Sequence, residues 1–407
     1  MRTPPLLLAG TILSLALVAG PALSQSAGEP VETRAPNGEG QTPAFENQTR
    51  APQPAATVKI KAEVVADDLP QLWAMELLPD GRMLVTAKEG EIHIVTAGSG
   101  GTTEVDGVPE VASAGQGGLL DVALAPDFEQ SRLIYFSFSE PRDDGNGTSV
   151  ASAKLVEESD GAALEDVKVI FRQSPSYNNS KHFGSRLAFG PDNMLYVTVG
   201  ERSDRNTRVH AQDLDSGFGK VFRIDASGKA PADNPFVGRN DAQAEIWSYG
   251  HRNLQSAAID SQGRLWTVEH GPKGGDELNR PEAGKNYGWP VISYGVEYSG
   301  GPLGDGITAA DGMEQPVYYW DPVIGPSGMA FYEGDAIPEW KGAVLIGGLV
   351  AQGVVVLHLE GDRVKFEEHV PLEARIRDVK VGPDGSIYAV TESRGGGGSS
   401  ILKLTKA

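Results

Sequence analysis

The sequence predicts an all-β fold, a six-bladed β-propeller made of four-stranded antiparallel blades. Three observations lead to this prediction. A hairpin-like phrase recurs six times along the 407 residues. Turn-forming residues are abundant, with 51 glycines and 27 prolines, which favours many short strands joined by tight turns. Apolar patterns with the 3.6-residue period of helices are scarce, which disfavours an α/β barrel.

The repeated phrase is an apolar strand, a turn of the Pro-Asp-Gly type and a returning β-branched or aromatic strand. A single hairpin cannot bury its face alone, and recurrence at roughly 45–80 residues is typical of propeller blades. A β-sandwich with similar turns is the alternative, but a sandwich does not require one phrase six times. The copies lie at 78–86, 190–198, 260–268 and 382–390, with looser ones at 125–136 and 340–346.

Residues 1–24 are predicted to be a secretory signal peptide. A positive Arg2 precedes the apolar stretch 6–19, and small residues at 22 and 24 predict cleavage near Ser24. A retained membrane anchor is the alternative, because two prolines stand near the start. No later apolar run approaches the roughly 20 residues that cross a bilayer, so the mature form is expected to lack a membrane span. The predicted location is periplasmic or secreted.

The rest of the chain divides into two parts. Residues 25–57 are rich in Pro, Gly, Glu, Gln, Thr and Ala and contain little to bury, which predicts a flexible linker. Alternation begins near Val58, so the catalytic propeller domain is predicted to span 58–407.

Composition excludes several kinds of function. The chain has 55 acidic and 35 basic residues, a net charge of −20, and phosphate binding needs a basic surface, so no nucleic acid partner is expected. It has no cysteine, which excludes disulfides, thiolate metal sites and cysteine nucleophiles. Any metal must therefore be held by oxygen or nitrogen ligands.

Two loop segments contain candidate catalytic residues. His182 lies beside small residues just before a predicted strand, and an imidazole can act as a general base near neutral pH. A loop histidine without a catalytic role is the alternative. Arg252, within 249–255, is suited to clamp a carboxylate or stabilise an oxyanion. A structural salt bridge between two blades is the alternative for this arginine.

Two further segments suggest ligand sites. Residues 269–279 combine three glycines, a proline and two adjacent carboxylates, a set that suits an oxygen-lined calcium site. A long loop without metal is the alternative. Arg375 and Arg377 alternate along a predicted strand and share one face, which suggests a polyanionic ligand. A solvated edge strand would produce the same pattern.

Six segments together resemble the soluble quinoprotein glucose dehydrogenase family, and most closely its bacterial branch of aldose sugar dehydrogenases. The resemblance extends from about Leu69 to Leu404. The segments are GQGGLLDVALAPDF at 115–128, HFGSRLAFGPD at 182–192, EIWSYGHRNLQ at 245–255, EHGPKGGDELN at 269–279, GKNYGWP at 284–290 and RIRDV at 375–379.

The resemblance implies an enzyme that oxidises aldose sugars at the anomeric carbon to the lactone, using pyrroloquinoline quinone (PQQ) and Ca²⁺. His182 matches the general base, and a hydride passes from the sugar to the quinone. Arg252 matches the residue that polarises the accepting carbonyl. The matching cofactor-binding residues are Gln116, Arg252, Asn253, His270, Arg375 and Arg377. The matching metal ligands are Gly271 and Pro272 for the calcium at the quinone, and Glu277 and Tyr287 for a further calcium.

Two departures from the family pattern affect the cofactor. No lysine occurs at 348–352, where the family has a cofactor-binding one, and His270 stands where a glutamine is expected. These changes predict weaker cofactor affinity. The long insertions that shape the sugar site and the dimer contact in the glucose enzymes of the family are reduced here. This predicts broad aldose specificity and a monomer or weak dimer. The resemblance also implies an external electron acceptor. A calcium-dependent lactonase or other hydrolase and a non-catalytic carbohydrate-binding propeller are the alternative functions.

Overall fold

The computed structural model describes residues 28–98, 101–159, 161–393 and 398–407. The predicted signal peptide, 1–24, lies outside them. The described residues form 24 strands and only short helical turns. None of their helices is long and apolar enough to cross a membrane. The helical turns are α1 (Phe128–Ser131), α2 (Arg205–Arg208), η1 (Val209–Gln212) and η2 (Pro338–Trp340).

Four sheets contain four antiparallel strands each. One joins the two ends of the chain, in the order β1 (Ile60–Leu69), β24 (Ser399–Lys406), β23 (Ile387–Thr391) and β22 (Ile376–Val381). The next is β10 (Leu187–Phe189), β11 (Leu195–Val199), β12 (Lys220–Ile224) and β13 (Ile246–Tyr249). The third is β14 (Leu254–Ile259), β15 (Leu265–Glu269), β16 (Asp276–Asn279) and β17 (Tyr318–Trp320). The fourth is β18 (Pro326–Phe331), β19 (Val344–Gly348), β20 (Gly353–Glu360) and β21 (Arg363–Pro371).

A fifth sheet contains eight strands but divides into two antiparallel runs of four. The strand ladder that joins the two runs into one sheet is the parallel pairing of β5 with β9, with Val105 opposite Ala162 and Asp106 opposite Ala163. The first run is β2 (Leu72–Leu77), β3 (Met83–Ala87), β4 (Glu91–Val95) and β5 (Thr102–Asp106). The second is β6 (Leu119–Leu124), β7 (Leu133–Arg142), β8 (Gly145–Glu158) and β9 (Gly161–Arg172). The prediction of an all-β protein with four-stranded antiparallel sheets is confirmed.

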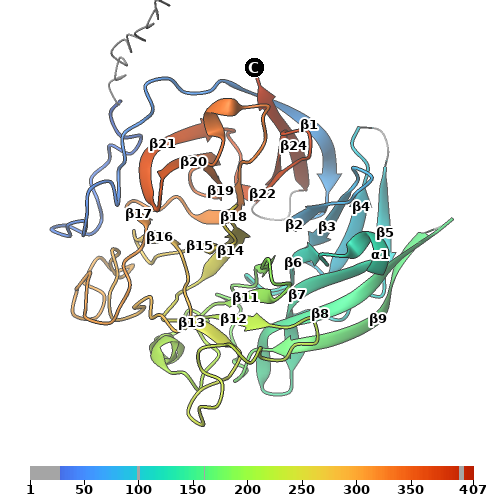
Figure 1. Cartoon of the computed structure of the whole chain (residues 1–407), viewed down its shortest axis with the longest axis horizontal. Coiled ribbons are helices and arrows are strands. Elements are labelled where there is room, and N and C mark those ends of the chain that lie inside the picture. Colours follow the sequence, from blue (N-terminus) through green and yellow to red (C-terminus); the bar gives the residue numbers. More distant parts are fainter. Residues whose placement is uncertain (1–27, 99–100, 160, 394–397) are drawn as a thin grey trace, which may run out of the picture.

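The four four-stranded sheets and the two halves of the fifth sheet make six runs of four strands. One edge strand of each run, which we call its leading strand, borders the centre of the molecule (Figure 1). In the sheet that joins the two ends of the chain, the leading strand is β22. Each leading strand contacts the next, and the circuit closes because β22 returns to β2. The strands of the circuit are β2, β6, β10, β14, β18 and β22. Loops that precede these strands therefore converge near the central axis.

The repeated phrase forms the hairpin between the first and second strands of each run. In the four clear copies the turn places one residue at positive φ: Gly81 (87°), Asn193 (61°), Gly263 (78°) and Gly385 (76°). Glycine and asparagine are the residues that adopt this conformation at least cost. The turn geometry thus explains why these residue types recur at this position.

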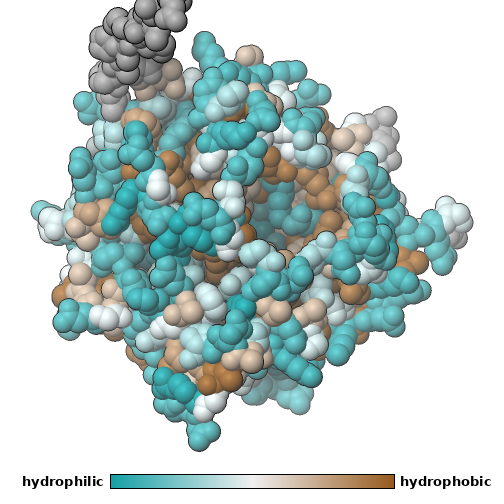
Figure 2. All heavy atoms as spheres, viewed as in Figure 1, coloured by the Kyte–Doolittle hydropathy of each residue, from teal (hydrophilic) through white to brown (hydrophobic). Residues whose placement is uncertain are grey.

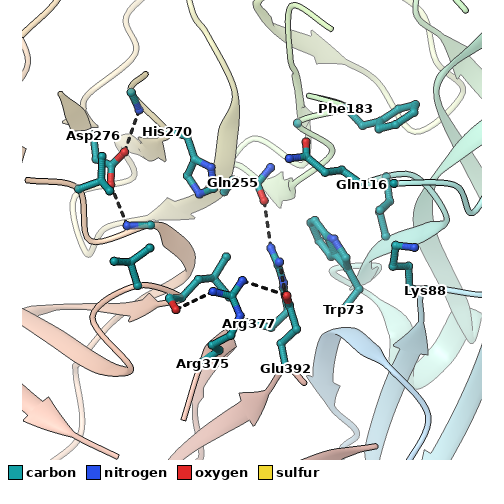
Figure 3. Close-up of a pocket in the computed structure, with 18 of the residues that line it drawn as sticks. Trp73, Lys88, Gln116, Phe183, Gln255, His270, Asp276, Arg375, Arg377 and Glu392 are labelled. Carbon is teal, nitrogen blue, oxygen red and sulfur yellow. Dashed lines mark hydrogen bonds and ion pairs between the residues drawn. The ribbon is translucent and has the colours of Figure 1, made fainter. Parts of the chain in front are cut away.

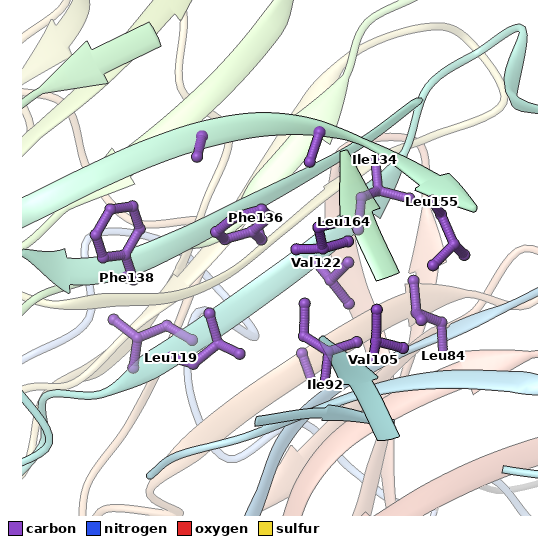
Figure 4. Packing of buried hydrophobic residues seen from close by; sticks show 14 of the residues in the cluster. Leu84, Ile92, Val105, Leu119, Val122, Ile134, Phe136, Phe138, Leu155 and Leu164 are labelled. Carbon is purple, nitrogen blue, oxygen red and sulfur yellow. The ribbon is translucent and has the colours of Figure 1, made fainter. Parts of the chain in front are cut away.

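Hydrophobic packing between neighbouring sheets forms the core. The largest cluster fills the space between the two runs of the eight-stranded sheet and includes Leu84, Leu119, Phe136 and Phe138 (Figure 4). Hydrophilic residues dominate the face shown in Figure 2, and hydrophobic ones gather around a hollow near its middle. The sheets are thus held together by apolar side chains, while the loops remain available for polar chemistry.

The segment predicted as a flexible linker differs from that prediction where the structure describes it. Residues 28–53, which we call the N-terminal strap, run beside β17 and β21 (Figure 1). Ala51 and Gln48 are fully buried, and the Ala51 amide donates a 2.9 Å hydrogen bond to the Tyr318 hydroxyl. Asn37 donates to the Asp321 carboxylate over 2.6 Å. A segment too polar to form a core of its own can still complete the core of its neighbours.

Candidate active site

A cavity of about 460 Å³ lies where the central loops converge. Its walls come from all six runs and the loops beside them, and the residues labelled in Figure 3 come from five of these runs. The predicted site residues on its wall are Gln116, His270, Gly271, Pro272, Arg375 and Arg377. The remaining predicted residues lie directly behind this wall or around a small adjoining pocket. The adjoining pocket contains Arg252, Glu277 and Tyr287 and shares His270 and Gly271 with the cavity.

His182 lies in the loop before β10 and is 5% exposed. Its backbone amide donates to Gln116 Oε1 over 2.8 Å, and its Nδ1 lies 2.9 Å from Glu201 Oε1. A carboxylate at Nδ1 favours the proton on that nitrogen, so Nε2 keeps a free lone pair. His182 has φ of +49°, an uncommon conformation for a non-glycine residue and one that clusters at functional sites.

Burial lowers the pKa of His182 below its ordinary value of 6.5, and the charge of Arg252 acts in the same direction. The hydrogen bond and negative charge of Glu201 oppose this shift. His182 is therefore neutral at pH 7, the state in which an imidazole can accept a proton. His182 is thus a buried loop histidine with defined partners, and its catalytic role stays a prediction.

Arg252 is held by backbone groups and by one carboxylate that contacts its main chain. Its amide donates to Glu269 Oε2 over 2.6 Å, and its Nη1 donates to the His270 carbonyl over 2.8 Å. The guanidinium lies 5.1 Å from the Trp289 ring centroid. Within the described part of the chain, no salt bridge joins this guanidinium to a carboxylate, and its Nε is buried without a hydrogen-bond partner. This geometry does not support the interpretation of Arg252 as a structural salt bridge.

His270 belongs to the cavity wall, and Asn253 lies behind it. Asn253 Oδ1 accepts a 3.2 Å hydrogen bond from the Gly184 amide, which links the loop of His182 to the loop of Arg252. His270 Nε2 lies 2.7 Å from the Pro326 carbonyl. Burial lowers the pKa of His270 to about 3, so this imidazole is neutral and donates to that carbonyl. His270 therefore brings no positive charge to the cavity.

Arg375 and Arg377 point into the cavity from the start of β22, and both bind Glu392 (Figure 3). Arg375 Nη2 lies 3.0 Å from Glu392 Oε1, and Arg377 Nε lies 2.5 Å from Glu392 Oε2. Arg377 Nη1 also donates to Gln255 Oε1 over 3.1 Å. Two guanidinium groups share one carboxylate, so this wall has an excess of positive charge. It is not a solvated edge strand.

The loop after β15 brings Gly271 and Pro272 to the cavity. Asp276 holds the loop, because its carboxylate accepts 2.8 Å hydrogen bonds from the amides of Gly271 and Gly325. Burial raises the pKa of Asp276 to about 7. Among the described residues, no backbone amide donates a turn or loop hydrogen bond to the Gly271 carbonyl or to the Pro272 carbonyl. Both carbonyl oxygens therefore remain available to a ligand.

Glu277 and Tyr287 adjoin the small second pocket. Burial and the charge of Glu269 raise the pKa of Glu277 well above its ordinary value. Asn279 Nδ2 donates to both carboxylates, at 3.0 Å to Glu269 and 3.1 Å to Glu277. Two neighbouring carboxylates of this kind favour a nearby cation. Tyr287 stacks on His251 at 4.7 Å and is itself buried.

No group of three or more His, Asp and Glu side chains converges as a metal site within the ranges that the structure describes. A lactonase of the kind considered above requires several acidic metal ligands in the channel. The candidate ligands are instead the main-chain carbonyls of Gly271 and Pro272, with the Glu277 carboxylate nearby. Such a set fits calcium, which accepts carbonyl oxygens.

The sequence interpretation missed several residues of the site that follow the second strand of a run. Lys88 comes directly after β3, Glu201 soon after β11 and Glu392 directly after β23. The second strands end at the edge where the first strands begin, so Lys88 and Glu392 reach the cavity wall and Glu201 reaches His182 behind it. The repeated hairpin could have predicted Lys88 and Glu392, because both directly follow the second strand of their hairpin, and Glu201 lies one position further along. Trp73 and Gln255 also line the cavity and were not predicted.

Comparisons with known proteins point to one family. The sequence model of the family described as Glucose / Sorbosone dehydrogenase matches residues 69–403. The chain is 44% identical over 358 residues to an aldose sugar dehydrogenase of Escherichia coli (strain K12), covering 86% of this chain and 94% of that protein. It resembles the solved apo-form of the soluble aldose sugar dehydrogenase from Escherichia coli, with a TM-score of 0.80, 41% identity, and coverage of 86% and 100%. It also resembles the PQQ-bound aldose sugar dehydrogenase from Streptomyces coelicolor, with a TM-score of 0.71, 31% identity, and coverage of 86% and 99%.

Proposed function

Because the chain belongs to the glucose/sorbosone dehydrogenase family, we propose that it oxidises aldose sugars at the anomeric carbon to the lactone, with PQQ and Ca²⁺. It is an oxidoreductase of the quinoprotein aldose sugar dehydrogenase type. One observation carries the proposed reaction. A neutral, carboxylate-oriented histidine lies behind the wall of a cavity that Arg375 and Arg377 line, and Arg252 lines the adjoining pocket.

We infer that the fold is a six-bladed propeller with its catalytic domain at 58–407. The closed circuit of six leading strands and the six hairpin phrases support this count. The parallel contact of β5 with β9 then joins two neighbouring blades at their outer strands. Export is proposed from the features of residues 1–24.

The cavity fits a polyanionic cofactor. Buried arginine Nε atoms on Arg252 and Arg375 have no hydrogen-bond partner among the described residues, and a ligand carboxylate or carbonyl would satisfy them. Gln116, Asn253, Arg375 and Arg377 would hold the quinone. Gly271 and Pro272 would hold calcium through their carbonyls, and Glu277 with Tyr287 would hold a further calcium.

When bound, PQQ supplies the hydride acceptor and Ca²⁺ the Lewis acid that polarises it. His182 Nε2 accepts the proton of the anomeric hydroxyl, because Glu201 keeps Nδ1 protonated. Arg252 presents a fixed positive charge on the side of the adjoining pocket, where it would stabilise negative charge that develops in the reaction. Electrons then leave to an external acceptor.

Glu201→Gln is expected to move the acid limb of kcat/KM to lower pH. In the native protein this limb lies below pH 6.5, because burial and Arg252 hold the pKa of His182 below that value. Glu201 raises this pKa, so its removal lowers the pKa further and the base stays neutral at more acidic pH. The maximal rate should fall at least about 10-fold, since the orienting carboxylate is lost. A pH profile of aldose oxidation checks this, and an unchanged acid limb contradicts the role of Glu201.

The function is tested by reconstitution. Purified protein, loaded with PQQ in excess Ca²⁺ and given glucose and a dye acceptor, should reduce the dye. Chelation of calcium before loading should abolish this activity, and restored calcium should recover it. Absence of dye reduction with every aldose tried, despite bound quinone, contradicts the dehydrogenase function.

A further inference from the structure

Lys88 lines the cavity on the side of Trp73 and Gln116 (Figure 3). Its backbone is fixed between two runs of strands, because its amide donates to the Gln71 carbonyl over 2.8 Å and its carbonyl accepts from the Leu119 amide over 3.1 Å. The side chain is 13% exposed. Lys88 is therefore a positioned cavity residue and not a freely moving surface lysine.

The charge of Lys88 is weakly compensated, in contrast to the charges of Arg375 and Arg377. Its Nζ donates to the Ser113 carbonyl over 2.6 Å. The nearest carboxylate oxygen belongs to Glu89, at 3.8 Å, and the Glu89 side chain is 62% exposed. A contact of that length to a solvated carboxylate contributes little. A lysine ammonium has three donors, so two remain for a ligand.

A mostly buried cation with one neutral partner is unfavourable until an anion binds it. The segment 348–352 brings no positive charge to the cavity, although Leu349 and Val350 line it. The Lys and Arg side chains that line the cavity are Lys88, Arg375 and Arg377. Their separation in the sequence suits a ligand that presents several carboxylates in different directions.

We propose that the Lys88 ammonium binds one carboxylate of PQQ, on the cavity side formed by Trp73 and Gln116. The inference rests on the proposed function, since it assigns a residue to that cofactor. Lys88 contacts the cofactor and takes no part in proton transfer. Lys88 thereby brings to the cavity a positive charge that the segment 348–352 does not provide.

Titration of the apo-protein with PQQ in excess Ca²⁺, followed calorimetrically, tests the proposal without turnover. Lys88→Gln removes the charge but retains a side-chain donor for the Ser113 carbonyl. Its Kd for PQQ is expected to rise about 10–100-fold, the effect of losing one charge-assisted hydrogen bond. Lys88→Arg should keep most of the affinity. Added salt should weaken binding to the wild type more than to Lys88→Gln.

Lys154→Gln is the matched control, because Lys154 is an exposed residue of β8 outside the cavity. It should bind PQQ as the wild type does. If Lys88→Gln unfolds, Lys88→Met provides the second neutral variant, and thermal unfolding establishes that the tested variants are folded. Unchanged affinity in a folded neutral variant, with weakened affinity in Arg377→Gln, overturns the role of Lys88 and leaves the proposed function intact. Failure of the wild type to bind PQQ overturns both.

Discussion

His182→Ala is expected to lower kcat for aldose oxidation about 10²–10⁴-fold, the usual contribution of a positioned general base. The imidazole is neutral, and Glu201 orients Nε2 for proton acceptance. Cofactor binding should survive, because Gln116, Arg375 and Arg377 remain on the cavity wall. Steady-state dye reduction and a PQQ titration of the same variant measure the two effects separately.

His210→Ala provides the matched control for this substitution. His210 is partly exposed and pairs with Asp213 at 2.7 Å, outside the residues that line the cavity. Its replacement should leave turnover near the wild-type value. Turnover retained in His182→Ala would remove this residue as the base, whereas loss of PQQ binding would assign it to the cofactor site instead.

Gln48→Ala is expected to lower the free energy of unfolding by about 2–3 kcal/mol, because it leaves buried polar groups without partners. The Gln48 side chain is fully buried in the N-terminal strap. Its Nε2 donates to the Pro316 carbonyl over 2.9 Å, and its Oε1 accepts from the Ala44 amide over 2.6 Å. Urea unfolding gives the free energy directly, provided that the slope with denaturant is unchanged.

Gln53→Ala makes the same chemical change elsewhere in the strap. The Gln53 side chain donates one 3.0 Å hydrogen bond to the Glu29 carbonyl, within the strap and near solvent. Its loss should change stability by no more than about 0.5 kcal/mol. Equal stability of both variants and the wild type would mean that the strap is a loose tether in solution.

Single sequence motifs predicted the site residues of this protein only in part, because the partners of those residues lie elsewhere in the chain. His182, Arg252 and the 269–279 run were each ambiguous as isolated segments, since a loop histidine, a salt bridge and a metal-free loop were open alternatives. Their order along the chain matched one family, and the family model confirms that resemblance over 69–403. The partners that give these residues their chemistry, Glu201 for His182 and Glu392 for the arginines, lie in other segments.

The sequence alone determined the strand-and-turn organisation, because a hairpin is a local structure. The residue types at Gly81, Asn193, Gly263 and Gly385 follow from one backbone conformation within a few residues. Only the tertiary structure decided which side chains meet, since contacts between runs join residues far apart in the chain. It placed Lys88 in the cavity, two guanidinium groups on one carboxylate and the polar strap against β17 and β21. Composition cannot predict such contacts, because burial depends on the surface that a neighbouring element presents.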